Sequence, residues 1–462
     1  MHMIIDRSLL CGLAASLLLA GCGGGSSTSD SGLDAAADGG ADTGPADSGP
    51  VDSGPTDTGT PDAGSGCTTG CGIVSLALGA QHSCALRENG DVLCWGDNED
   101  LELGDGSERH ADCSADGMLP IDCTSRPVLA SISDVTELAS SGGHSACVRQ
   151  TDGSVSCWGR AGALRPGVPD PRRATPEVQP TWSGAAQLSD SERHTCAILA
   201  DGSVSCIWQN DGGQLGDGTS TERLSPVAVS GLTGALELRV STYPGSFTCA
   251  RTATDVQCWG INSTGELGDG STTHQACPSG ATTLDCATSP VTVSGLTDAT
   301  QITAGSEHAC ALEADGTLVC WGANSGGQLG IDRATAFVGT PTAVPGLTGV
   351  QQVVAGSHHT CVLLTGGSVQ CFGFNKLGEL GDGVLTGHGS ICDIASDTGD
   401  CSSTPVDVTL PEAATLLAAG ERHTCALLES GAVACWGVDD RMQLGQADRE
   451  PRSTPVLVSG LD

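Results

Sequence analysis

The sequence predicts an all-β protein, a seven-bladed β-propeller that follows a signal segment and a disordered acidic linker. Three observations support this prediction. A pair of short cysteine-bearing strands recurs seven times, a strand led by proline follows each copy, and Gly-containing turns separate these segments. The unit returns about every 56 residues and holds four short strands. Four-stranded sheets repeated around an axis make a propeller.

The chain is strongly acidic and poor in aromatic residues. Among its 462 residues, 55 are acidic and 19 are basic, so the formal net charge is -36. Such a charge repels polyanions, which excludes nucleic acid as a partner. Only 3% of the residues are aromatic, while there are 67 glycines and 24 cysteines. Cross-links and small apolar residues must therefore stabilise the fold.

The first 21 residues resemble a bacterial lipoprotein signal peptide. Arg7 precedes an apolar run of about 13 residues, which is shorter than the ~20 residues of a membrane span. The run ends at Leu19-Ala20-Gly21-Cys22, where small residues precede a cysteine. The resemblance implies cleavage before Cys22 and lipid attachment to that residue. We therefore expect an exported protein anchored in the cell envelope, at the outer membrane or the cell surface.

Residues 22–71 read as a linker of Gly, Ser, Thr, Ala, Pro and Asp. Eight aspartates lie between Asp30 and Asp62, with no Lys or Arg among them. Their mutual repulsion should keep this segment extended and free of a core. Calcium binding by the aspartates is the alternative, although a calcium loop needs closely spaced ligands gathered by a turn. The propeller domain is then residues 72–462.

Each unit contains a hairpin with one cysteine on each strand. The turns carry Gly after Asn or Asp, as in Asn89-Gly90, and the cysteines are nine or ten residues apart. This spacing sets them opposite each other on facing strands, within the Cα range of a disulfide. The predicted hairpin disulfides are Cys84–Cys94, Cys147–Cys157, Cys196–Cys206, Cys249–Cys258, Cys310–Cys320, Cys361–Cys371 and Cys425–Cys435.

The other cysteines of the exported chain also pair without remainder. Six lie in three long loops and one pair precedes the first strand, which predicts Cys113–Cys123, Cys277–Cys286, Cys392–Cys401 and Cys67–Cys71. A full set of pairs indicates an oxidising compartment. Zinc coordination fits less well because zinc sites use close pairs such as C-x-x-C, so we predict no metal and no cofactor.

The ordered landmarks G-x-x-H-[ST]-C-A-L, x-D-G-x-V-x-C-W-G and N-x-x-G-Q-L-G resemble the regulator of chromosome condensation repeats over residues 72–462. The resemblance implies a structural hydrogen-bonding role for the recurring histidines, which are His82, His144, His194, His308, His359 and His423, with Phe247 in the fourth unit. The tryptophans that recur once per unit should pack between neighbouring blades. We also expect the C-terminal segment from Pro455 to close the ring by completing the sheet that begins near Ile73.

Three insertions share a sequence pattern that runs from a histidine through one cysteine to an Asp-Cys pair. They begin at His110, His274 and His388 and leave equivalent corners of their units, so they should lie on one face. Loops beyond the needs of a fold are where scaffolds often place recognition. These histidines are therefore candidate binding residues, with stapled surface decoration as the alternative.

The second unit departs most from the pattern. Its loop gathers Arg160, Arg165, Arg172 and Arg173 within an acidic protein. This cluster could receive an anionic partner. Decay of the repeat, with acidic neighbours such as Asp170, is the alternative.

Since one fold serves many functions, and this family includes a secreted β-lactamase inhibitor and nucleotide exchange factors, the fold does not select the function. We predict a non-catalytic, monomeric interaction module of the cell envelope that binds an extracellular protein or glycan. An inhibitor of a secreted enzyme is the alternative. A propeller glycan hydrolase or lyase is less favoured, because no paired carboxylates or activated nucleophile stand out.

Overall fold

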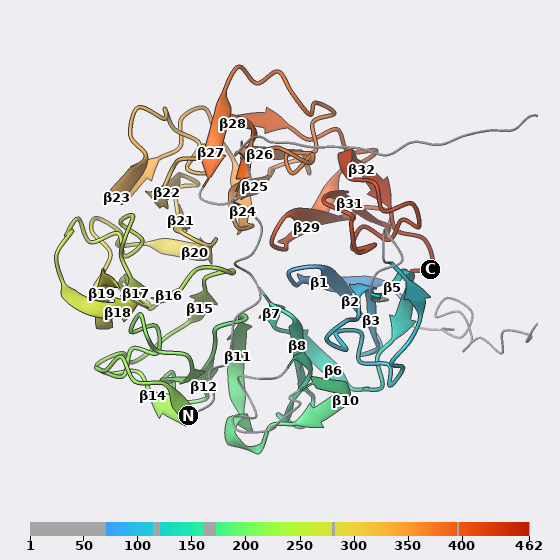
Figure 1. Ribbon diagram of the computed structural model, residues 1–462, viewed down its shortest axis with the longest axis horizontal. Helices are drawn as coiled ribbons and strands as arrows, with labels where there is room; N and C mark the ends of the chain where they lie inside the picture. The colour runs from blue at the N-terminus through green and yellow to red at the C-terminus, as the bar shows by residue number, and fades with distance from the viewer. Residues whose placement is uncertain are drawn as a thin grey trace, which may run out of the picture. The chain divides into compact units, whose positions relative to one another are not determined.

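The computed structural model describes residues 71–113, 121–141, 143–160, 172–279, 282–394 and 397–461. Across these residues seven antiparallel sheets stand side by side around a central axis (Figure 1). This is the predicted seven-bladed propeller. None of the helical structure in these ranges is long and apolar enough to cross a membrane. The predicted signal peptide, Cys22 and the predicted linker up to residue 70 lie outside the described residues.

The first three blades are built from consecutive stretches of chain. Blade 1 contains β1 (Ile73–Leu78), β2 (His82–Arg87), β3 (Val92–Asp97), β5 (Asp122–Leu129) and β4 (Ala111–Asp112). Blade 2 contains β6 (Val135–Leu138), β8 (Ser145–Gln150), β9 (Val155–Arg160) and β10 (Arg172–Val178). After the short 3-10 helix η1 (Pro180–Trp182), blade 3 contains β11 (Ala185–Asp190), β12 (His194–Leu199), β13 (Val204–Trp208) and β14 (Arg223–Ala228), and β7 (Ser140–Ser141) pairs with β11.

The last four blades repeat the same order. Blade 4 contains β15 (Glu237–Val240), β16 (Phe247–Arg251), β17 (Val256–Ile261), β19 (Thr282–Thr292) and β18 (Gln275–Ser279). Blade 5 contains β20 (Ala299–Ala304), β21 (His308–Glu313), β22 (Leu318–Ala323) and β23 (Phe337–Ala343). Blade 6 contains β24 (Val350–Ala355), β25 (His359–Leu364), β26 (Val369–Phe374), β28 (Asp397–Asp407) and β27 (Ile391–Ile394). Blade 7 contains β29 (Ala414–Ala419), β30 (His423–Leu428), β31 (Val433–Gly437) and β32 (Arg452–Leu457).

The ring does not close by exchange of a strand, so the expectation for the segment from Pro455 is wrong. The C-terminal strand β32 pairs with β31 inside blade 7, and β1 pairs with β2 inside blade 1. Side chains make the closure instead. Ile73, Leu427 and Leu461 share one buried apolar cluster, and Arg87 donates a hydrogen bond of 3.3 Å to the Leu461 carbonyl. Because apolar burial is non-directional, the ring closes without a shared strand.

Ten disulfides lie among the described residues, with the pairing that the sequence predicted. The seven hairpin pairs have Cα atoms 4.1 Å apart, and each joins residues directly opposite in the ladder. The pairs of the three insertions are Cys113–Cys123, Cys277–Cys286 and Cys392–Cys401. The predicted Cys67–Cys71 pair involves Cys67, which lies outside the described residues. Each of the ten disulfides therefore staples a single blade internally.

Buried histidines connect neighbouring blades. The imidazole Nε2 lies close to a Ser or Thr hydroxyl of the next blade in His194–Thr248 (2.7 Å), His308–Thr360 (2.9 Å), His359–Thr424 (2.9 Å) and His423–Ser83 (3.0 Å). The Thr360 hydroxyl donates to the Gln328 carbonyl, so it accepts the Nε2 proton of His308. Burial lowers the pKa of His308 to about 3, which keeps this imidazole neutral.

The glycine three residues before His308, His359 and His423 has a steric reason. A Cβ at Gly305 would overlap the imidazole of His308, and the same holds for Gly356 with His359 and Gly420 with His423. The recurring G-x-x-H therefore leaves room for a ring that packs onto backbone.

His144 does not belong to this ring, which corrects one member of the predicted set. Ser145 pairs with Gly159 as His82 pairs with Gly96, so Ser145 occupies the ring position and His144 precedes it. The Ser145 hydroxyl donates instead to the carboxylate of Asp190 in blade 3. The side chain of His144 is 23% exposed. It is therefore available to the surface of the propeller, unlike the ring histidines.

In five of the seven blades a tryptophan packs against the loop of the preceding blade, as the sequence predicted. The indole Nε1 donates to a backbone carbonyl across the junction in Trp95–Gln443, Trp158–Glu102, Trp259–Gln214, Trp321–Glu266 and Trp436–Glu379, at 2.6–3.1 Å. The acceptor is in every case the first residue of a Q-L-G or E-L-G segment. These bonds fix the position of that Gln or Glu side chain at the junction.

Candidate binding face

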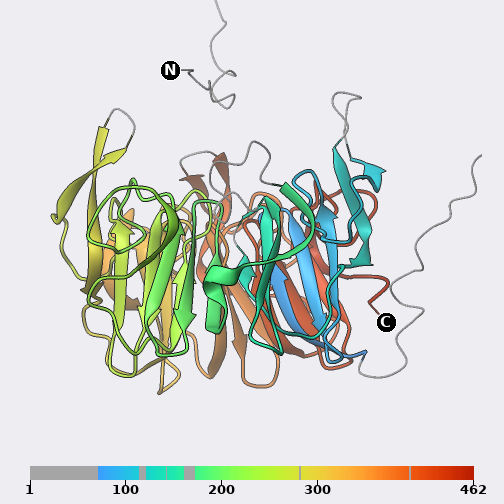
Figure 2. The same ribbon diagram turned by 90° about the horizontal axis from the view of Figure 1, so that it is seen from below.

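The three insertions rise from one face of the propeller. Each lies between the third and fourth strands of its blade, where β4 precedes β5, β18 precedes β19 and β27 precedes β28. Figure 2 shows the cyan and yellow insertions of blades 1 and 4 extending from the same side of the ring. We call this side the insertion face. The prediction that equivalent corners place the insertions together is thus what the structure shows.

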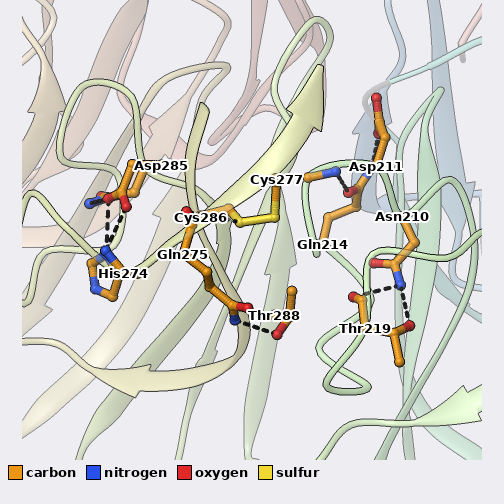
Figure 3. Close-up of a disulfide and its surroundings, with 12 residues drawn as sticks. Asn210, Asp211, Gln214, Thr219, His274, Gln275, Cys277, Asp285, Cys286 and Thr288 are labelled. Atoms are coloured by element: carbon orange, nitrogen blue, oxygen red, sulfur yellow. Dashed lines mark hydrogen bonds and ion pairs between the residues drawn. A yellow bond between two sulfur atoms is a disulfide. The ribbon is translucent and has the colours of Figure 1, made fainter. Parts of the chain in front are cut away.

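Each insertion is held at its base by a histidine between two aspartates. In blade 4, His274 Nε2 lies 2.9 Å from Asp269 Oδ2, and its Nδ1 lies 2.9 Å from Asp285 Oδ2 (Figure 3). The same arrangement recurs as Asp105–His110–Asp122, at 2.9 and 3.2 Å, and as Asp382–His388–Asp400, at 2.7 and 2.5 Å. We call this arrangement the Asp–His–Asp clamp. Both ring nitrogens are engaged within the insertion, so the candidate histidines hold the loops in shape.

The clamp of blade 1 is an ion pair at neutral pH. Burial alone would lower the pKa of His110, but hydrogen bonds and charge from Asp105 and Asp122 outweigh it and raise the pKa to about 9. The pKa values of His274 and His388 are raised for the same reasons. Burial opposes ionisation of Asp122, yet the hydrogen bond with His110 lowers its pKa. A charged clamp next to a disulfide gives each insertion two fastenings.

The arginines of unit two do not form an isolated basic patch. Arg160 is partly exposed, with Nη1 3.8 Å from Asp100 and 3.9 Å from Glu192. Arg172 donates to the Glu99 carbonyl at 3.1 Å, and Arg173 pairs with Glu177 at 3.0 Å. Arg165 and Asp170 lie outside the described residues. The described arginines thus contact acidic side chains or a carbonyl of the same protein.

A polar cluster lies at the junction of blades 1 and 2. Asp97, Glu102 and His144 each offer one ligand-type atom, and these atoms lie within 4.8 Å of one another. His144 Nδ1 is 3.1 Å from Glu102 Oε1. Burial alone would lower the pKa of His144, but the hydrogen bond to Glu102 and nearby carboxylates raise it to about 9. Burial, with Glu102 beside it, raises the pKa of Asp97 to about 8.

The equivalent junctions hold different partners. Glu379 of blade 6 accepts a hydrogen bond of 2.8 Å from Arg422 of blade 7. Glu266 of blade 4 lies near Glu307 of blade 5, and burial followed by that like charge raises the pKa of Glu266 to about 7. The residue before the ring position thus decides what faces each E-L-G glutamate: His144, Glu307 or Arg422.

Sequence reasoning missed Asp97 and Glu102, although the repeats carried a signal. The residue after the C-W-G or C-F-G segment is Ile261, Ala323, Phe374 and Val438 in four later units, whereas the first unit has Asp97. A carboxylate at a position that is apolar in four other units is a candidate functional residue.

The central channel forms a cavity of about 280 Å³ lined by the inner strands. Its charged lining residues are Glu137, Asp190 and Arg239. Glu137 pairs with Arg149 at 2.9 Å, Arg239 pairs with Glu237 at 2.9 Å, and Asp190 accepts hydrogen bonds from Ser145 and Thr195. In the described part of the wall each of these groups is engaged with a neighbouring side chain, which differs from the opposed carboxylates of a glycosidase.

Comparison with known repeats gives the same architecture. One model of the regulator of chromosome condensation (RCC1) repeat matches residues 73–100, 299–328, 350–379 and 415–446, and a second matches residues 255–312 and 315–363. Among solved structures, yeast RCC1 (Prp20) bound to Kap60 has a TM-score of 0.63 at 20% identity, covering 83% of this chain and 85% of that one. Human WBSCR16 has a TM-score of 0.64 at 18% identity, covering 80% and 94%.

The proteins whose sequences are similar to this chain carry unrelated names. The ultraviolet-B receptor UVR8 of Arabidopsis thaliana is 25% identical over 84% of this chain and 82% of the receptor. Protein pim1 of Schizosaccharomyces pombe is 30% identical over 68% of this chain and 61% of pim1. The human E3 ubiquitin-protein ligase HERC2 is 30% identical over 62% of this chain but only 6% of the ligase. The chain therefore spans less than two thirds of two of these three relatives.

Proposed function

Since this chain carries RCC1 repeats and folds as a seven-bladed propeller, we propose that it is a non-catalytic binding module whose insertion face holds a protein partner. The three fastened insertions on one face are the observation that supports the proposal. Each has its own disulfide and its own Asp–His–Asp clamp. Loops already held in shape lose little conformational entropy when a partner binds.

The insertion of blade 6 and the loop that leads into it offer apolar side chains for such a contact. Val384, Leu385 and Ile391 are 39%, 45% and 67% exposed. Apolar groups that become buried at an interface can serve as its energetic centre, while the polar residues around them set the register. We therefore place the centre of the protein contact on this insertion.

We further propose that the protein is exported and anchored in the cell envelope through Cys22. The lipoprotein-like N-terminus supports this, and so does a fold that depends on disulfides, which persist in oxidising compartments. The linker of residues 22–71 would then hold the propeller away from the membrane. Metabolic labelling with an alkyne fatty acid tests the anchor: the label should be lost in Cys22→Ala and retained in Cys11→Ala, and label retained in Cys22→Ala contradicts it.

Affinity capture from detergent-solubilised envelopes tests the binding face. The bait is the full chain, compared with Ile391→Asp and Leu385→Asp variants. Leu457→Asp is the matched control, since Leu457 is also exposed, at 53%, but lies on the outer strand β32. We expect one protein to be captured by the parent chain and by Leu457→Asp and lost from both insertion variants.

Other outcomes of that capture decide between the candidate functions. If all three variants still capture the protein, the contact lies elsewhere and the proposed role of the insertion face is contradicted. Recovery of a secreted enzyme whose activity falls on binding identifies the module as an inhibitor. Capture of no protein, with retention on envelope polysaccharide, replaces the protein partner with a glycan.

A further inference from the structure

Asp97 is a buried carboxylate with one oxygen unpaired. Its side chain is 2% exposed, and its Oδ1 has no hydrogen-bond partner among the described residues. An ionised carboxylate without a partner is costly to bury. The carboxylate nevertheless lies within 4.8 Å of ligand-type atoms on Glu102 and His144. The unpaired oxygen therefore points to a cation that completes the cluster.

The surroundings of the cluster are negative on balance, with Arg441 acting on Asp97 and Arg160 3.8 Å from Asp100 as the positive groups. Glu102 is fully buried, and its Oε2 is held by the backbone amide of Asp100 at 2.9 Å, which leaves Oε1 facing His144. Asp100 Oδ2 lies 3.9 Å from His144 Nδ1. Glu192 of blade 3 and Glu421 of blade 7 are close enough to His144 to interact electrostatically with it. The negative electrostatic potential of these carboxylates favours a bound metal cation over a cluster that holds only the His144 imidazole.

We propose that Asp97, Glu102 and His144 bind a divalent transition-metal cation, with Zn²⁺ as the ion best matched to two carboxylates and one imidazole. Zinc bonds of about 2.0–2.2 Å place tetrahedral ligand atoms roughly 3.3 Å apart. The Glu102–His144 pair is already 3.1 Å apart, so the remaining adjustment falls on Asp97. Imidazole in the ligand set favours zinc over Ca²⁺ and Mg²⁺, which prefer oxygen.

The ion has a route and an open position. The side chains of His144 and Asp100 are both 23% exposed, so the cluster opens to solvent on one side. Water or the Asp100 carboxylate can supply a fourth ligand there. Asp97 and Glu102 remain covered, which gives the site a fixed inner wall.

The metal would link two blades whose junction lacks the usual bond. His82 of blade 1 faces the position that carries Ser or Thr in five of the seven blades, but blade 2 has Ala146 there, which has no hydroxyl. Ligands from blade 1 (Asp97 and Glu102) and blade 2 (His144) would replace that hydrogen bond with coordination. This role is independent of any partner on the insertion face.

Metal content of the chelator-stripped full chain, reloaded with Zn²⁺ and dialysed, tests the site. We expect one Zn²⁺ per chain by elemental analysis, and a midpoint of thermal unfolding that rises with Zn²⁺ concentration, as binding to the folded state alone requires. The absence of stoichiometric Zn²⁺ in the reloaded parent chain overturns the proposal.

Substitutions locate the ion. Asp97→Asn and His144→Gln keep side-chain shape and should each weaken Zn²⁺ binding at least tenfold and flatten the thermal response. Glu266→Gln and Asp439→Asn are the matched controls. Glu266 is the same E-L-G residue in blade 4, and Asp439 is a buried carboxylate with an unpaired Oδ2 in blade 7. Controls that bind like the parent are expected, whereas parent-like binding by Asp97→Asn or His144→Gln contradicts the assignment.

Discussion

The imidazole Nε2 of His423 in the last blade lies 3.0 Å from the hydroxyl oxygen of Ser83 in the first. The hydrogen bond that joins neighbours within the ring therefore also spans its closure. At the junction of blades 4 and 5, Phe247 and Ala309 take the two positions and share an apolar cluster. Both members change together because a buried polar group without its partner costs free energy.

This pairing predicts coupling between His308 and Thr360. Each of His308→Phe and Thr360→Ala should lower the free energy of unfolding by about 1–3 kcal/mol. His308→Phe leaves Thr360 only its bond to the Gln328 carbonyl, and Thr360→Ala leaves the Nε2 of His308 unpaired. The double variant reproduces the Phe247–Ala309 pair and should lose about 1 kcal/mol less than the sum. Urea denaturation at pH 7 measures the three differences, and strictly additive losses contradict a bonded pair.

The same double variant should change the response to acid. The pKa of His308 is lowered to about 3 by burial, so the unfolded chain binds its proton first, near pH 6.5. The stability that the neutral imidazole contributes is present above pH 6.5 and is lost as the pH falls toward about 3, by up to ~1.4 kcal/mol per pH unit. The stability of the double variant should fall less steeply in this window. Parallel pH profiles of the parent and the double variant would show that His308 titrates normally.

The Asp–His–Asp clamp responds to base instead. Its carboxylates raise the pKa of His110 to about 9, so its stabilisation is complete below pH 6.5 and disappears as the pH rises through about 9. An NMR titration of the His110 ring should show a midpoint well above 6.5, and Asp105→Asn should lower it. Asp285→Asn, which alters the equivalent clamp of blade 4, should leave it unchanged. A midpoint near 6.5 in the parent protein rules out the charged clamp.

A hairpin disulfide should contribute substantially to stability. Cys310 and Cys320 close a loop of ten residues, and the chain-entropy model gives about 2–3 kcal/mol for such a loop. Replacing both with Ala should lower the free energy of unfolding by this amount. Chemical denaturation under oxidising conditions measures the loss. The Cys277→Ala/Cys286→Ala variant, which lacks an insertion disulfide, should lose less stability than the hairpin variant. An unchanged free energy of unfolding in the variant that lacks Cys310 and Cys320 would mean that the backbone hydrogen bonds between the strands stabilise the hairpin without the disulfide.

Contacts within a repeat could be predicted from the sequence, because the recurring pattern shows which residues face each other across each hairpin. Cys249 and Cys258, nine residues apart, still face each other as the shorter turn requires. His144 was wrongly included in the ring because the repeats match one another at their histidines as well as at their cysteines. Counting back from Cys147 places Ser145 at the ring position, since Cys84 and His82 are two residues apart.

Contacts between repeats were harder to predict. Asp97 and His144 come from different blades, and their approach depends on how one sheet packs on the next. In the same way, the sequence pattern that contains His274 and Asp285 predicted an insertion. The clamp also needs Asp269 from the preceding loop, which that pattern did not indicate. Side-chain convergence of this kind follows from three-dimensional packing, which a linear pattern does not contain.

Because β32 stays within its own blade and Leu461 meets Arg87 of the first blade, the order of the chain gives no blade a privileged place. A gene that began at blade 4 and joined residue 461 to residue 72 through a short linker would encode the same ring. Circular permutation at the connections between blades should therefore preserve the propeller, whereas a cut within a stapled hairpin would separate two strands that must pair.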